Sequence, residues 1–439
     1  MLPRVTLVEH IPFGDSMRIA RHRLANGLMV LLLVDRSAPV VSYQTWFRVG
    51  SRHEKVGKTG LAHLFEHLMF NETKNQKAGE FDRALESAGG ETNAATWVDW
   101  TYYYENLPKS ELKLVVALEA DRMANLVLRD PQVKSEKEVV ANERRYRVDD
   151  DVEGAVNEKL YAVAFKKHPY RWPTIGWMKD IKGFTTKDCR DFYNTFYAPN
   201  NACVVLVGDI DEKAALRLID KHYGKLKASR IPAEKKIVEP EQTAEKTLVM
   251  KQATPTEKLQ LGYRAPSFGE FDYAALTIAN EILVGGRSSR LYRALVSDGE
   301  IASEVRASIA PFRDPGLYEI WVSAREKKKA RASLAILERE FKKIIANGVT
   351  DDELNKAKNR LELGFLQGME TASGKAEQIG FYEIVVSDPG QVFRRLDEYR
   401  RVTSEDIKRV AKNVFQAKQR TTIFVLPSGK TSANAEADE

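Results

Sequence analysis

Apolar and polar positions along the chain alternate between the period of a strand and the period of a helix. The first half begins with apolar runs on either side of Asn26-Gly27, a dipeptide typical of a tight hairpin. Helical spacing then covers 61–70 and 80–88, and it returns over 110–128. Between them lies the aromatic and threonine-rich segment 91–107, which has the composition of strands. The first half is therefore predicted to mix strands with helices.

The second half repeats this order of elements. Its pattern predicts strands over 247–250 and 258–263, helices over 273–283 and 288–295, and a further strand over 316–324. Strands interrupted by pairs of helices favour a mainly antiparallel sheet with helices packed on one side.

The two halves also end alike. Thr185 and Thr403 each precede a helical pattern, and an aspartate, Asp188 or Asp406, stands three residues later. This spacing is typical of a helix start, and an apolar strand follows the helix in both cases. We infer an α+β fold built from two homologous domains of roughly 200 residues each.

A stretch that has lost its periodicity separates the halves. Residues 231–246 are rich in proline, glutamate, lysine and threonine, which is the composition of an exposed linker. We expect a first domain over 1–230, this linker, a second domain over 247–430 and a loose tail over 431–439.

Composition and charge exclude several classes of protein. Of the 439 residues, 43% are hydrophobic and 30% are charged, as in ordinary globular proteins. The net charge of +6 is spread along the chain, so no nucleic-acid partner is expected. The longest apolar run, Leu28 to Val34, is too short to cross a membrane, and it lacks the basic flank typical of a leader. The chain is expected in the cytoplasm, or in the periplasm if a leader was removed; Cys189 and Cys203, predicted to be buried thiols, do not distinguish these compartments.

The segment "GLAHLFEHLMF" at 60–70 contains the main candidate chemistry. His63 and His67 are four apart, so on a helix both imidazoles reach one ion. Glu66 lies on the same side and could take a proton from water. Thr59 is placed as the residue that caps this helix. A catalytic zinc ion needs three protein ligands, so a further ligand has to come from elsewhere.

The segment "SEKEVVANERRYR" offers that ligand. Glu136 and Glu143 are seven apart, and they therefore share one face of a helix that we expect to begin near Ser135. Another interpretation is that the histidines are ordinary core residues and the glutamates are solvated.

The order H-x-x-E-H, with a glutamate 76 positions after the second histidine, resembles the pitrilysin, insulinase and mitochondrial processing peptidase family of inverzincins. The stretches "VGSRHE", "GGETNAATWVDWTYY", "FYAPNNACVVLVGD" and "LVGGRSSRLYRAL" are also similar to that family. The resemblance covers nearly the whole chain and suggests the zinc-bearing subunit of the short, two-domain bacterial type.

This resemblance implies a zinc metalloendopeptidase with one Zn²⁺ per chain. His63, His67 and Glu143 correspond to the metal ligands, and Glu66 to the general base. Glu136 corresponds to a group that orients a ligating histidine.

The resemblance also implies how an unfolded peptide would bind. Family members of this length form two-subunit chambers, where the peptide joins the edge of a sheet as an added strand. The matching edge here is Asn93, Ala94, Ala95 and Thr96.

One departure from the family pattern concerns the second half. Active members carry an arginine and a tyrosine seven apart, and these positions fall on Val296 and Ser303. Neither side chain could stabilise a developing oxyanion as that pair would. We therefore expect a heterodimer, rather than a homodimer, in which a homologous zinc-less subunit supplies the pair. The alternative is a non-catalytic structural or peptide-binding subunit of the same fold.

Overall fold

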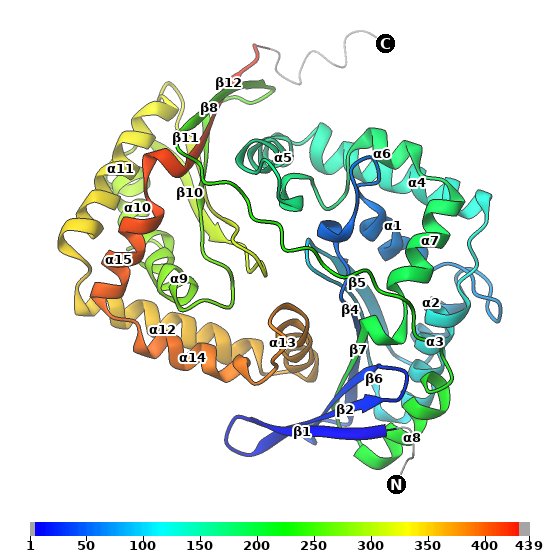
Figure 1. The fold of residues 1–439 in the computed structure, drawn as a ribbon. Helices are drawn as coiled ribbons and strands as arrows, with labels where there is room; N and C mark the ends of the chain where they lie inside the picture. Colours follow the sequence, from blue (N-terminus) through cyan, green and yellow to red (C-terminus); the bar gives the residue numbers. More distant parts are fainter. Residues whose placement is uncertain (1–4, 430–439) are drawn as a thin grey trace. The chain divides into compact units, whose positions relative to one another are not determined.

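The computed structural model describes residues 5–429, which form two compact units (Figure 1). The first unit comprises the residues up to 144 together with 172–236 and 366–394. The second comprises 145–171, 237–365 and the residues from 395 onward. The domain boundaries predicted from the sequence mark the two homologous halves of the chain, not compact units. These boundaries stay a prediction. The tail predicted for 431–439 lies outside the described residues.

Twelve strands run through the described residues. They are β1 (Val5–Phe13), β2 (Met17–Leu24), β3 (Met29–Val34), β4 (Val40–Phe47), β5 (Glu91–Thr96), β6 (Thr101–Pro108), β7 (Ala202–Gly208), β8 (Lys246–Gln252), β9 (Lys258–Arg264), β10 (Ala302–Ile309), β11 (Leu317–Ala324) and β12 (Arg420–Pro427).

The helices of the first half are α1 (Leu61–Leu68), α2 (Glu80–Ser87), α3 (Leu112–Asn125), α4 (Asp130–Arg144), α5 (Val152–Ala164), α6 (Met178–Gly183), α7 (Thr186–Phe196) and α8 (Glu212–Tyr223). Those of the second half are α9 (Phe271–Val284), α10 (Arg290–Tyr292), α11 (Ala330–Asn347), α12 (Asp351–Gly368), α13 (Ala372–Val385), α14 (Gln391–Arg401) and α15 (Ser404–Val414).

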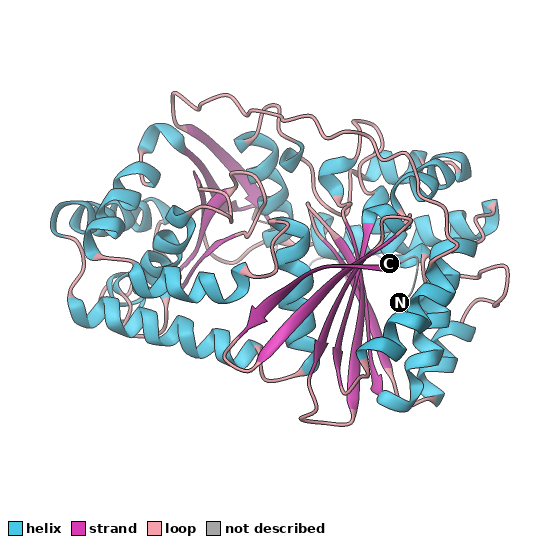
Figure 2. Cartoon of the chain, turned by 60° about the horizontal axis from the view of Figure 1, so that its bottom comes forward, coloured by secondary structure: helices cyan, strands magenta, loops and turns pink. Residues whose placement is uncertain are grey.

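The sheet of the first unit has seven strands in the order β1-β2-β3-β7-β4-β6-β5. Figure 2 draws the strands in magenta and the helices that cover them in cyan. Only the pair β3 and β7 is parallel, and every other neighbouring pair is antiparallel. The strand β5, which contains the predicted peptide-binding residues, therefore lies at one edge of the sheet.

The sheet of the second unit has the order β10-β11-β9-β12-β8, with β12 and β8 as its parallel pair. In reverse, the order of the second sheet is β8-β12-β9-β11-β10, and each strand corresponds to one in the series β3-β7-β4-β6-β5 of the first sheet. The intervening helices also occur in the same succession. The predicted fold class, two homologous α+β domains with mainly antiparallel sheets, is confirmed.

Both faces of the first sheet are covered, as the side chains of β4 show. Tyr43 donates a hydrogen bond from its hydroxyl to Tyr223 of α8, and Thr45 donates one to Glu119 of α3. On the other face, Trp46 packs against Gly380 of α13. The helix α13 thus covers the face opposite to α3 and α8, whereas the sequence predicted helices on one side of the sheet.

The helix α13 comes from the second half of the sequence, and an equivalent exchange occurs in the second unit. There α5, from the first half, lies against β8, β9 and β12. Its Leu160 contacts Gly262 of β9, and Tyr161 donates a hydrogen bond to Glu319 of β11 at 2.6 Å. Each sheet is therefore completed by a helix from the opposite half of the chain.

Three predicted helix boundaries near the candidate site were wrong. The helix α1 begins at Leu61 as predicted but ends at Leu68 rather than at residue 70. Gly60 is its N-cap, and Thr59, the predicted cap, instead donates its hydroxyl to Asp180. The helix α4 begins at Asp130 rather than near Ser135, since the proline that follows Asp130 is well suited to a first helical turn. The helix α3 covers 112–125, which is shorter than predicted.

Two further boundaries differ in the same way. The helix α2 ends at Ser87, just before the predicted end. In the second unit, the helix predicted over 288–295 is reduced to α10, which a π-helical turn over Arg293–Ser297 follows.

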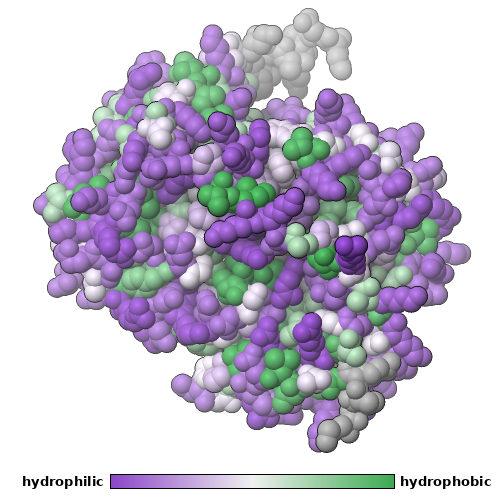
Figure 3. Space-filling model, in the orientation of Figure 1, coloured by the Kyte–Doolittle hydropathy of each residue, from purple (hydrophilic) through white to green (hydrophobic). Residues whose placement is uncertain are grey.

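The surface and the helices agree with the balance of residues in the sequence. Hydrophilic side chains predominate on the face in Figure 3, and the hydrophobic ones form small separate groups. Over the described range, no helix has the length and apolar character needed to cross a bilayer.

Candidate metal centre

The start of α1 is held by a carboxylate from an upstream turn. Glu54 is buried, and its two oxygens accept hydrogen bonds from the backbone amides of Gly60 and Ala62, both at 2.8 Å. Amides at a helix start lack partners within the helix, and the two oxygens of Glu54 satisfy them. Burial raises the pKa of Glu54 well above its ordinary value, and the hydrogen bonds from the Ala62 and Gly60 amides oppose that shift. Glu54 thereby determines where α1 begins and which side chains it presents.

A close backbone contact holds the same end. Gly60 has a φ of 97°, and a Cβ atom at this position would lie 2.5 Å from the carbonyl oxygen of Ile175. Arg144, the last residue of α4, donates a hydrogen bond to the carbonyl of the adjacent Gly176 at 2.8 Å. The start of α1 and the end of α4 thus lie against the same loop. Near the end of α1, the Tyr103 hydroxyl donates to the carbonyl of Phe65 at 2.9 Å.

This arrangement brings two histidines of α1 next to one glutamate of α4. The Nε2 atom of His67 lies 3.3 Å from Oε2 of Glu143, and the Nε2 atom of His63 lies 3.6 Å from the same oxygen. One ligand atom from each of the three residues lies within 4.8 Å of the other two. The structure therefore brings together the three residues predicted as ligands.

The separations fit a zinc ion. Two ligands at about 2.05 Å in tetrahedral geometry lie about 3.3 Å apart, close to both observed distances. Two imidazoles and one carboxylate also form a ligand set that catalytic zinc sites use, with the fourth position left for a water molecule. The role of His63, His67 and Glu143 as ligands stays a prediction, and their chemistry and spacing are those that it needs.

The charges around His67 favour a cation. Burial lowers the pKa of His67, but Glu143 opposes it most strongly, with help from Glu66 and Glu136, and the pKa is raised above its ordinary value. Three carboxyl groups thus act on one imidazole. A divalent cation placed there would be stabilised by the same groups.

Glu136 occupies the position expected of a residue that orients a ligand. Its Oε2 lies 3.9 Å from Nδ1 of His67, on the opposite side of the ring from Glu143. Its other oxygen accepts a hydrogen bond from Asn71 at 3.1 Å. Burial raises the pKa of Glu136 above its ordinary value, while His67 and Asn71 oppose that shift. At 3.9 Å the two groups lie beyond hydrogen-bond distance, and the role of Glu136 in orienting His67 stays a prediction.

The remaining predicted site residues lie on neighbouring elements. Glu66 is half-buried on α1, between the two histidines. The predicted peptide-binding residues, 93–96, lie on the edge strand β5, against which α1 packs.

The two departures from the family pattern lie in the second unit. Val296 is buried in the π-helical turn, and Ser303 lies in β10 with its hydroxyl donating to the carbonyl of Ser323 at 3.3 Å. Neither offers a guanidinium or a phenol.

Sequence reasoning missed three residues that position the site: Glu54, Asn71 and Tyr103. Glu54 is six residues before the amide of Gly60, and no local pattern links a loop carboxylate to a helix start at that spacing. Asn71 and Tyr103 act through contacts with residues distant in sequence, so their roles depend on the fold.

Comparison with known families and proteins gives the same picture over the whole chain. Residues 29–176 match the model described as Insulinase (Peptidase family M16), and residues 183–361 match the Peptidase M16 inactive domain. The zinc protease PqqE of Helicobacter pylori is 33% identical over 413 residues, which cover 92% of each chain. The beta subunit of the mitochondrial-processing peptidase of Blastocladiella emersonii is 25% identical over 416 residues, covering 92% of this chain and 88% of that protein.

Solved structures agree with these sequence matches. A protease from Helicobacter pylori superposes with a TM-score of 0.89 at 32% identity, over 93% of this chain and 99% of that one. A structure described as a peptidase M16 inactive domain, from Pseudomonas fluorescens, has a TM-score of 0.85 at 18% identity, over 94% and 98% of the two chains, and shows the shared fold. With the family models, the relatives and the ligand geometry in agreement, the chain belongs to the insulinase family of peptidases, M16.

Proposed function

We propose that this chain is a zinc-dependent endopeptidase that hydrolyses unfolded peptides, with one Zn²⁺ held by His63, His67 and Glu143. The observation that carries the proposal is the approach of both Nε2 atoms to one Glu143 oxygen, at 3.3 and 3.6 Å. Three neighbouring carboxyl groups, Glu143, Glu66 and Glu136, support a cation there against the cost of burial.

The reaction needs a proton acceptor beside the metal. When bound, zinc supplies Lewis acidity, which makes a water molecule acidic enough to ionise near neutral pH. The Glu66 carboxylate, on α1 between the two ligating histidines, would take the proton from the attacking water and deliver it to the leaving amine. Glu136 would hold the ring of His67 through Nδ1.

The substrate would bind as an added strand on β5. This strand is the last in its sheet, so one side of its backbone has no strand neighbour among the described residues. An extended peptide bound there is held by main-chain hydrogen bonds, which explains how many sequences could be accepted. Asn93, Ala94, Ala95 and Thr96 are the residues that we assign to this contact.

We further propose that a homologous zinc-less subunit completes the site. Val296 and Ser303 replace the arginine and tyrosine of active family members, and one oriented oxyanion donor is worth ~10² to 10³ in rate. The chain would therefore be a weak enzyme alone, and a partner that carries the pair would supply what is missing.

The first experiment replaces Glu66 with glutamine. Glu66→Gln should retain one zinc per chain but lose cleavage of an unstructured peptide by ~10² to 10⁴, because general acid–base catalysis contributes that much. Metal analysis and a quenched-fluorescence assay measure the two properties. Glu86→Gln, an exposed glutamate on the nearby α2, is the matched control and should behave as wild type. Substantial cleavage by Glu66→Gln would show that another group is the base.

A second experiment separates the enzyme from the non-catalytic alternative. The zinc-loaded chain is assayed alone and with a homologous subunit recovered by native pull-down. We expect weak cleavage alone and an increase of about 10² with the partner. Full turnover by the homogeneous chain would refute the partner requirement. Stoichiometric zinc without cleavage in either preparation would favour a peptide-binding subunit.

A further inference from the structure

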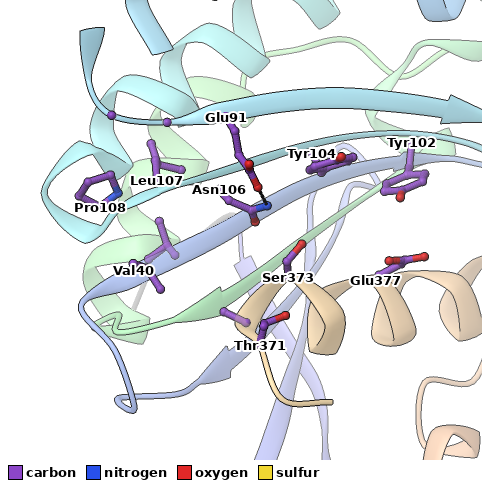
Figure 4. Close-up of a pocket in the computed structure, with 14 residues that line it drawn as sticks. Val40, Glu91, Tyr102, Tyr104, Asn106, Leu107, Pro108, Thr371, Ser373 and Glu377 are labelled. Atoms are coloured by element: carbon purple, nitrogen blue, oxygen red, sulfur yellow. Dashed lines mark hydrogen bonds between the residues drawn. The ribbon is translucent and has the colours of Figure 1, made fainter. Parts of the chain in front are cut away.

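A groove of about 660 Å³ lies on the first sheet beside the start of α13 (Figure 4). Strands β5 and β6 form one wall, and Thr371, Ser373 and Glu377 form the other. All of its lining residues belong to the first unit.

The groove opens on the sheet face opposite to α1. Side chains alternate between the two faces along a strand. On β6, Tyr103 points toward α1, where its hydroxyl reaches Phe65, so Tyr102 and Tyr104 point to the other face. Both of these tyrosines line the groove. Their rings are stacked, with centroids 5.7 Å apart and planes 23° apart.

The charged groups that line the groove are all acidic. Glu91 lies on β5 and Glu377 on α13, and no lysine, arginine or histidine appears among the lining residues in the described part of the chain. Lys375, on the same helix as Glu377, is buried and paired with Asp35 at 2.8 Å. Glu91 accepts a hydrogen bond at 2.8 Å from the side-chain amide of Asn106, a neutral donor. Figure 4 shows Glu377 on the helix opposite Tyr102.

The edge strand connects the groove with the proposed peptide site. Asn93 pairs with Tyr104 and Ala95 pairs with Tyr102, so both share the face of the groove. A peptide strand added beside β5 places every second side chain on this face. Neighbouring strands are about 4.8 Å apart, so a side chain has to cross β5 to reach Tyr102. Ala95 projects only a methyl group there, and a long side chain can pass over it.

We propose that this groove is a specificity subsite that takes an arginine or lysine side chain of the peptide. This inference rests on the proposed binding of peptide to β5. The basic group would lie against the partly exposed ring of Tyr104, within reach of Glu377. Tyr102 is buried with its ring stacked on Trp46, and it supports the floor of the groove. The face of the Tyr104 ring attracts a cation, and the carboxyl groups of Glu91 and Glu377, with no basic residue beside them in the lining, add to that attraction. The subsite adds selectivity to a binding mode that is otherwise sequence-tolerant.

The test measures binding and cleavage with the full chain. An unstructured peptide carries a single arginine that is moved one position at a time, and each peptide is paired with one that has neutral citrulline instead. Binding is measured by fluorescence anisotropy on zinc-loaded Glu66→Gln, and cleavage is measured on wild type. We expect the peptide with arginine to be favoured over its citrulline counterpart by about tenfold, and only when the arginine is at every second position. Alternate residues of an extended peptide face the groove. Adding Glu377→Gln should reduce this ratio toward one, whereas adding the control Glu86→Gln should leave it unchanged.

The outcomes distinguish this subsite from the proposed activity. An arginine preference in binding without cleavage by wild type would overturn the peptidase proposal and keep the subsite. Cleavage with no arginine preference at any position, or a preference that survives in Glu377→Gln, would overturn the subsite and keep the peptidase. Absence of both binding and cleavage would overturn both. Thermal unfolding of each variant identifies a loss caused by misfolding, and in that case Tyr104→Leu replaces Glu377→Gln as the test of the groove.

Discussion

The two units share a frame but differ in chemistry. Their sheets have equivalent strand orders, and α9 in the second unit occupies the place in the succession that α1 has in the first. All seven histidines of the chain nevertheless precede residue 223, so α9 contains none. A duplicated sheet needs only a repeated pattern of apolar positions, which many sequences satisfy. A metal centre needs particular residues at particular places, and over residues 5–429 a group with that ligand chemistry is found in the first unit alone.

The helices that complete the sheets differ in a second way. In the first unit, the small residue is Gly380 on α13, and the large one is Trp46 on the strand. In the second unit, Gly262 lies on the strand and Leu160 on α5. The glycine that allows close packing is therefore on the helix in the first unit and on the strand in the second.

The largest expected effect concerns the proposed metal ligands of the first unit. His63→Ala should lose zinc and reduce cleavage by about 10³ or more, because a bound metal contributes several kcal/mol of transition-state stabilisation. Metal analysis and the peptide assay measure both losses. His222→Ala, a histidine of α8 outside the site, is the control. A normal zinc content in His63→Ala would mean that the ligands lie elsewhere and that the contrast between the units is not chemical.

A smaller effect is expected from the residue that orients a ligand. Glu136→Gln should weaken zinc binding by about 10- to 100-fold, since groups behind metal ligands typically contribute that much. Competition with a chelator measures the affinity. Glu138→Gln, on the same helix, serves as the control and should match wild type. Unchanged affinity in Glu136→Gln would show that the 3.9 Å approach to His67 has no energetic consequence.

Packing of the exchanged helices can be compared through two glycines. A Cβ atom at Gly380 would lie 2.2 Å from Nε1 of Trp46, which is buried and cannot move aside easily. Gly380→Ala should therefore destabilise the protein by about 1 to 3 kcal/mol.

Gly262→Ala is the matched comparison, and it should cost less. The nearest atom to its Cβ is the flexible Cδ1 of Leu160, at 3.0 Å. Urea denaturation measures both variants. Equal shifts in the denaturation midpoint would show that the two contacts are equivalent despite their reversed roles.

The smallest effect should be the same in both units. Thr185 accepts from the amide of Asp188 and Thr403 from that of Asp406, and each aspartate completes a capping box. Thr185→Ala and Thr403→Ala should each cost ~1 kcal/mol, the usual value for a lost helix cap. Thermal unfolding with matched Thr→Ser variants as controls would measure this. A clear difference between the two caps would show that the repeats are not energetically equivalent.

Much of the site and the fold could be predicted because the signals were local. The pairing of Thr185 with Asp188 depends on residues three apart, and so does its counterpart in the second half. His63 and His67 share a helix face through a fixed four-residue spacing. The extent of α4 was misjudged because two start signals, at Asp130 and at Ser135, lie within two turns and local patterns did not rank them.

The amino-acid sequence alone was enough to identify the duplicated α+β frame, the H-x-x-E-H helix and its resemblance to the insulinase family, because all three depend on periodicity and short spacings. Only the tertiary structure could show that Glu54 holds the start of α1, that α5 and α13 are exchanged between the sheets, and that Tyr102 and Glu377 share a groove. These contacts join residues far apart along the chain, and their distances follow from how the strands and helices pack, which no local pattern records.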